Sequence, residues 1–280
     1  MQIKAGFKKE WLQFTRTFRL GGIILAIASF ALADPLMYWA MNLLLEGIST
    51  TQAAVADTGA LDIGDVASVF NNAGVVFSMT MAEFCSTSTL IIMLVLMSPC
   101  GGEQKKRATI IPSCTGLGTF EYLIPKYILY PVTVFAVTFV SCLLAGGICN
   151  LVFKDGTVGA GMMFLAALLC AVYLAFIIVV YMSIGLCTSR PGVVTIFMYI
   201  GVSIVQIFLN QLGLTKFHPL TLRALVTGEM FTESFALSDE IGSIAVGTVL
   251  SVVIGVMMFV LTLAVQKGTR INNQEDKPEF

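Results

Sequence analysis

The chain has 280 residues, of which 57% are hydrophobic and only 12% charged, with a net charge of −1 and a mean hydropathy of +0.89. Soluble domains usually carry about 25% charged residues, so this composition excludes a soluble globular protein and indicates lipid surroundings. No basic face large enough to bind nucleic acid is present. The seven cysteines contain no C-x-x-C pair, so neither a disulfide framework nor a metal site is expected.

Residues 1–19 have the pattern of an amphipathic helix lying flat in the membrane interface. Apolar residues recur at helical spacing, and the lysines lie largely off that face. The apolar positions are Ile3, Phe7, Trp11, Phe14 and Phe18. The helix serves either as a topology anchor or as an elbow that also touches a cytoplasmic partner.

Six stretches are long and apolar enough to cross a bilayer, which takes about 20 residues each. They are Leu20–Leu45, Val75–Pro99, Tyr127–Phe153, Gly159–Cys187, Val193–Leu214 and Ile241–Val265. A signal-peptide interpretation ending at Ala33 is disfavoured, because the apolar run resumes at once. The fold class is therefore an all-α membrane protein, with a six-helix domain over residues 20–265 and a cytoplasmic tail over 266–280.

Thirteen of the sixteen lysines and arginines lie on one side of these spans. Because cytoplasmic loops are rich in Lys and Arg, we expect this side, which carries both termini, to be the cytoplasmic one. The protein is then a multi-pass protein of the cell membrane.

Asp34 and Glu83 are the only carboxylates well inside the spans. Counted from the cytoplasmic ends, both lie roughly 21–24 Å up, so they could meet on adjacent helices. One interpretation is that they line a translocation path for a cationic or hydroxyl-rich substrate. The other is that either is protonated or bonds a neighbouring helix, with Asp34 serving a break at Pro35.

The outer loop over 215–240 holds the lone His218, followed by an amphipathic piece that we expect to form an outer gate. A ligand role for one histidine is not expected. The loop over 100–126 is the most informative stretch. It has a charged cluster, a short apolar piece, a Gly-rich turn and a second amphipathic piece, typical of a positive-inside loop or of a docking element for another protein.

The order of these features resembles the type-2 ATP-binding-cassette (ABC) transporter permeases, in which the exporter's ATPase is a separate subunit. The residues that carry the resemblance lie in the basic elbow and in the loop after the second span. The loop residues are Glu103, Gln104, Lys105, Lys106, Arg107, Ala108, Thr109 and the segment from Glu121 to Lys126. The chain departs from the family pattern at Ala108, where glycine is usual, and at Pro125, which interrupts the second piece.

The resemblance implies that the loop is a coupling helix received by a cytoplasmic ABC ATPase. It implies a catalytically silent subunit, paired with a second permease copy, with ATP and Mg²⁺ bound on the partner ATPase and no cofactor on this chain. The chain has no phosphate-binding loop of its own. An ATP-independent transporter or channel using Asp34 and Glu83 is the alternative, whereas no HExxH or G-x-S-x-G constellation supports an intramembrane enzyme.

Overall fold

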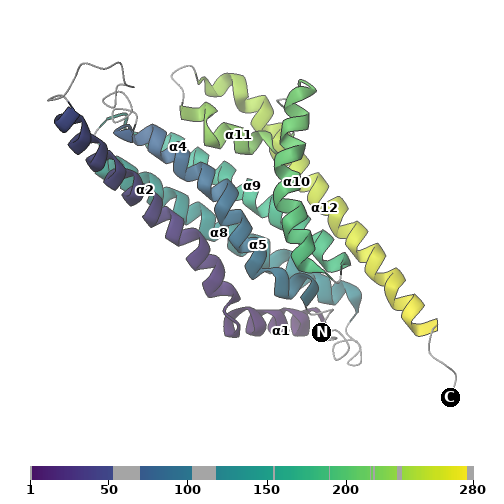
Figure 1. Ribbon diagram of the computed structural model, residues 1–280. Coiled ribbons are helices and arrows are strands. Elements are labelled where there is room, and N and C mark those ends of the chain that lie inside the picture. The colour runs from purple at the N-terminus through teal and green to yellow at the C-terminus, as the bar shows by residue number, and fades with distance from the viewer. Residues whose placement is uncertain are drawn as a thin grey trace.

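A computed structural model describes residues 2–52, 70–102, 118–153, 155–188, 190–214, 216, 218–231 and 235–275. Within these residues the protein is all-α and contains six helical segments long and apolar enough to cross a membrane, as expected. The long helices run side by side, and the short helix α1 (Gln2–Arg16) lies across one end of the bundle (Figure 1). We call this the α1 end.

The first two spans differ in regularity. Helix α2 (Arg19–Gln52) continues as one helix through Pro35, whose ring removes one backbone hydrogen bond without ending the helix. The second span consists of α4 (Ala73–Glu83), a π-helical turn η1 (Phe84–Ser88), α5 (Thr89–Val95) and a second π-helical turn η2 (Ser98–Gly102). Such π-turns are rare and occur frequently at functional sites.

Hydroxyl groups stabilise the first π-turn. Thr89 Oγ1 donates to the carbonyls of Phe84 and Cys85, both at 3.2 Å, and Ser86 Oγ donates to the Ala82 carbonyl at 2.8 Å. In a lipid environment, backbone groups displaced from a regular helix need such internal partners. The Ser/Thr-rich sequence from 86 to 89 therefore explains why a wide turn is tolerated here.

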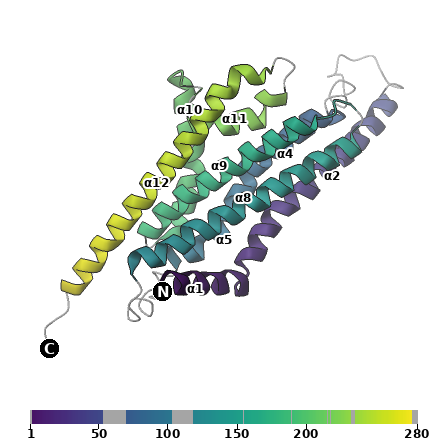
Figure 2. The same ribbon diagram turned by 180° about the vertical axis from the view of Figure 1, so that it is seen from behind.

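The third to sixth spans are α8 (Thr119–Val152), α9 (Ala160–Cys187), α10 (Pro191–Gln211) and α12 (Leu237–Glu275). Helix α8 includes residues 121–126, so the second amphipathic piece of the loop is the start of a span and not a separate surface helix. Helix α12 continues through most of the predicted tail. Its C-terminal end lies at the α1 end of the bundle, whereas the short helix α11 (Thr221–Thr227) and the 3-10 turn η3 (Glu229–Phe231) lie at the opposite end (Figures 1 and 2).

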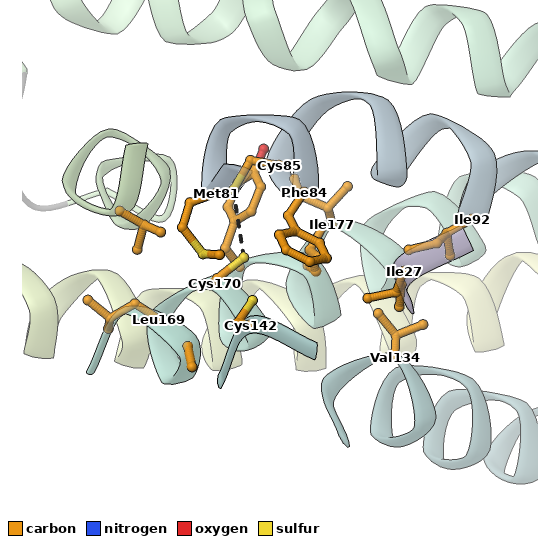
Figure 3. Close-up of a cluster of buried hydrophobic side chains, with 14 of the residues drawn as sticks. Ile27, Met81, Phe84, Cys85, Ile92, Val134, Cys142, Leu169, Cys170 and Ile177 are labelled. Carbon is orange, nitrogen blue, oxygen red and sulfur yellow. Dashed lines mark hydrogen bonds between the residues drawn. The ribbon is translucent and has the colours of Figure 1, made fainter. Parts of the chain in front are cut away.

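The core lies where α9 packs against α8 and α12 and against the π-turns of the second span (Figure 2). Figure 3 shows its centre, with Cys85, Cys142 and Cys170 among apolar side chains that include Met81 and Phe84. The Cys85 and Cys170 sulfur atoms are 3.9 Å apart and both thiols are free. Of the six cysteines described, five are buried and only Cys187 is exposed. They act mainly as small apolar residues.

At the α11 end, side chains join the spans at their turns. Asn72 precedes α4 and accepts hydrogen bonds from the backbone N–H groups of Gly74 and Val75 at 2.9 and 3.3 Å. Gly156 packs against this cap with φ of +64°, where a Cβ atom would lie 2.3 Å from the Asn72 amide oxygen. Only glycine fits this position. Asn150 likewise closes the turn between α8 and α9 through two 2.9 Å bonds to Val158.

Candidate functional site

A buried ionic cluster holds α1 against the rest of the protein at the α1 end. Lys126 of α8 is fully buried, and its Nζ lies 3.2 Å from a carboxylate oxygen of Glu10 on α1. The same ammonium donates to the Pro99 carbonyl at 3.0 Å and lies 4.9 Å from the centre of the Tyr122 ring. Three different elements, α1, η2 and α8, are therefore joined at a single side chain.

Tyr130 extends this cluster to the first span. Its hydroxyl donates to Glu10 at 3.3 Å and accepts from the Arg19 guanidinium at 2.9 Å. Arg19 also donates to Ser98 Oγ at 3.1 Å. Because a buried charge is tolerated when it is paired and hydrogen-bonded, this network fixes the position of α1 relative to α2, η2 and α8.

The buried face of α1 differs from the apolar face that the sequence suggested. Gly6, Glu10 and Phe14 face the protein, whereas Ile3 and Trp11 are exposed. Gly6 is required for the close approach, since a Cβ atom there would lie 2.5 Å from the carbonyl oxygen of Glu121. Sequence reasoning missed Glu10. The sequence did contain a signal for it. Glu10 is the only acidic residue in an otherwise basic helix, four positions after Gly6 and four before Phe14.

The structure describes only two of the residues predicted to contact an ATPase, Glu121 and Lys126. Glu103, Gln104, Lys105, Lys106, Arg107, Ala108 and Thr109 lie outside the described residues. Glu121 lies in the first turn of α8 and is partly exposed. Lys126 lies inside the molecule, so as placed here it does not present its charge to a cytoplasmic partner; it joins α8 to α1 instead.

Asp34 and Glu83 lie on neighbouring spans, where each carboxyl group acts electrostatically on Tyr38, and Glu83 also on Asp34. Asp34 is 6% exposed, and its Oδ2 has no hydrogen-bond partner in the described part of the chain. Glu83 accepts a 2.6 Å hydrogen bond from Thr87 within the π-turn. A role of the two carboxyl groups in a translocation path stays a prediction.

His218 lies three residues before the first residue of the short helix α11. Its Nδ1 accepts a hydrogen bond from the backbone N–H of Thr221 at 3.1 Å, which holds the turn that leads into α11. Burial lowers the pKa of this imidazole below its ordinary value. Leu222, Leu225 and Val226 of α11 are buried, so the amphipathic piece packs onto the spans as expected, while its role as a gate stays a prediction.

The described surface has two notable hollows. A groove of about 480 Å³ between α8, α9 and α12 is almost entirely apolar, with Tyr127 and Ser251 as its only lining residues that carry a polar side chain. A smaller cavity of about 50 Å³ is lined by η1, α5, α9, α10 and α11 and contains Arg223. The larger hollow is suited to hydrocarbon, whereas the smaller one has the charge and hydroxyl groups that recognise polar ligands.

No group of three or more potential metal-binding side chains occurs within the residues that the structure describes. No family model matches the chain, and no curated protein or solved structure gives a significant match.

Proposed function

We propose that this chain is the permease subunit of an ABC exporter, in which a separate cytoplasmic ATPase drives substrate efflux. The observation that carries the proposal is the ionic attachment of α1 to the start of α8. Residues 103–117 lie between η2 and α8 and contain the cluster assigned to ATPase contact. A force applied to that segment acts on the spans only if its ends are held firmly.

The network provides that firm connection. Lys126 bonds both Glu10 of α1 and the carbonyl of Pro99, which is part of η2. The elements that flank the segment, η2 and α8, therefore meet in one cluster, and α1 packs against the same cluster. Movement of the segment by an ATPase would shift α1, the end of the second span and the start of the third span together, as hinge or shear motions of packed helices do.

The distribution of charge supports the orientation. Among the described residues, the α1 end carries most of the lysines and arginines, including those of α1 itself. The positive-inside rule then places this end in the cytoplasm, where an ATPase is available. The exposed face of α1, with Trp11 and Ile3, would lie in the interface of the inner leaflet.

A second permease copy has surface available to it. Helices α10 and α12 are the least buried of the six spans within the single chain, and both expose long rows of branched apolar side chains. Lipid or a second copy would cover them. We propose that the functional unit contains two permease chains and two ATPase subunits.

The test is co-purification of this chain with the cytoplasmic ABC ATPases of the cell that produces it. The variant carries E103K, K105E, K106E and R107E, and the control carries K267E and K277E, which makes the same net charge change elsewhere on the predicted cytoplasmic side. We expect the ATPase to co-purify with the wild type and the control and to be lost or uncoupled in the loop variant. Absence of any associated ATPase would refute the proposal.

The second candidate is an ATP-independent, ion-coupled transporter. A specific observation favours it: Asp34 is buried with one oxygen unbonded, and it interacts electrostatically with Glu83, which directly precedes the π-turn η1. An intramembrane carboxyl group in this setting is a candidate ion or proton site. Reconstituted protein without ATPase would then show transport driven by an ion gradient and abolished by D34N, whereas an ABC permease would show none.

A further inference from the structure

Arg223 is a cation at the α11 end for which the described chain provides no acidic partner. It projects from α11 into the cavity between η1, α5, α9 and α10. It interacts with the Tyr173 hydroxyl and, electrostatically, with the Cys85 thiol, and it forms no ion pair with any described carboxylate. A guanidinium is positively charged, so an anion is the complement that the cavity lacks.

The contrast with the other described cations is informative. Lys126 is paired with Glu10 inside the protein, and Lys216, also at the α11 end, is paired with Glu240. Lys216 is 47% exposed, whereas Arg223 is partly buried. A partly buried charge gains more from an opposite charge than an exposed one, because water screens it less. Of Arg223 and Lys216, the two described cations at the α11 end, Arg223 is therefore the one on which a ligand anion would have the greater effect.

The lining of the cavity is amphipathic. Tyr199 and Ser203 of α10 provide hydroxyl groups near the opening, since both residues are exposed. Met93, Ile177 and Val202 provide an apolar wall. Hydroxyl groups and a guanidinium can all donate to one oxyanion, while the apolar wall suits a hydrocarbon chain.

Size limits what the cavity holds. A buried water occupies roughly 10–15 Å³ on this measure, so a cavity of about 50 Å³ accommodates a few waters or a single carboxylate or phosphate group. The hydrocarbon part of a ligand would have to leave through the mouth beside α10, whose outer face is apolar and exposed.

The π-turn is an independent observation at the same place. Cys85 and Ser86 line the cavity from η1, where the helix widens by one residue. Regular α-helical geometry would present these side chains differently to α9 and α11. Wide turns of this kind recur at binding sites, which is consistent with a helix shaped around a ligand.

We propose that this cavity binds the single anionic group of an amphipathic molecule, a carboxylate or phosphate attached to a hydrocarbon chain, with Arg223 as its counter-ion. The site is distinct from Asp34 and Glu83, whose charge would favour a cation and which do not line it. The proposal deepens the proposed function by naming the class of cargo, and only this role as cargo rests on that function. The binding itself is measured on this chain alone.

The experiment is native mass spectrometry and thermal unfolding of the full chain in a non-ionic detergent, with dodecyl phosphate as the probe. Dodecanol tests the need for the anion, and inorganic phosphate tests the need for the chain. We expect saturable binding of one dodecyl phosphate per chain, with at least tenfold weaker binding of both comparison compounds. Equal binding of dodecanol, or equal binding of inorganic phosphate, would overturn the proposal.

Three variants locate the site. R223Q should weaken dodecyl phosphate binding at least tenfold, whereas K216Q, which removes a cation at the same end, should bind like the wild type. S203F fills the exposed mouth without touching the core and should also weaken binding, so the test survives if R223Q does not fold. Wild-type affinity in both R223Q and S203F would refute this location.

The outcome is separable from that of the proposed function. Arg223-dependent binding without any associated ATPase would refute the exporter proposal and leave the anion site standing. ATPase coupling with no Arg223-dependent binding would leave the exporter proposal standing and refute the anion site.

Discussion

Replacing Lys126 by methionine tests the ionic cluster that attaches α1 to the bundle. Both partners of the Lys126–Glu10 pair are almost fully buried, with side-chain exposures of 0% and 2%. Removing the ammonium leaves a carboxylate in a site that water does not reach. Only the 3.3 Å hydrogen bond from Tyr130 then remains to it among the contacts described above.

The expected cost follows from this geometry. Breaking a buried ion pair by removing one partner costs about 3–5 kcal/mol. The reverse variant, E10Q, should cost less, about 1–3 kcal/mol, because Lys126 retains the Pro99 carbonyl and the Tyr122 ring. The double variant E10Q/K126M should cost less than the sum of the two, since neither side then leaves an uncompensated charge.

The measurement is reversible unfolding in mixed micelles, followed by circular dichroism and arranged as a double-mutant cycle. K9M is the matched control, because Lys9 lies over the same Tyr122 ring, also 4.9 Å from its centre, and lacks a buried carboxylate partner in the described contacts. The control should lose about 1 kcal/mol or less. If E10Q and K126M are additive, or each costs no more than K9M, the pair does not hold α1 and the reasoning about the cluster is wrong.

Three further predictions follow from the described side chains. G6A should destabilise the protein by about 1–3 kcal/mol in the same assay, because its Cβ would collide with a backbone carbonyl of α8, whereas G147A, with open space around it, should be neutral. In a chain lacking Cys114, a membrane-impermeant maleimide should label exposed Cys187 in inverted vesicles only; labelling of intact cells would reverse the orientation. Thermal stability should fall as pH drops below about 6.5, because the lowered pKa of His218 means that the folded state binds its proton less readily than the unfolded state. H218N, which keeps an acceptor near Nδ1, should lose this pH dependence, and an unchanged profile would show that another group causes it.

The sequence by itself determined the six spans, the basic end and the amphipathic start of the chain. These features depend on the free energy of transferring local segments from water to lipid, which adds up along the chain. Helix α10, for example, was predicted over Val193–Leu214 and is observed over Pro191–Gln211. The expectation that Asp34 and Glu83 lie at a similar depth in the membrane also came from local sequence, because the helical rise per residue converts residue number into depth.

Only the tertiary structure decided which side chains meet. Tyr130 bonds Glu10 across 120 residues and Arg19 across 111, and neither contact has a periodic signature in the sequence. For the same reason Lys126 was assigned to a partner surface although it is buried. The Arg223 cavity draws its walls from five elements. Its charge and its hydroxyl groups come together only when those helices pack, because a binding site depends on distances between segments that hydropathy along one segment does not specify.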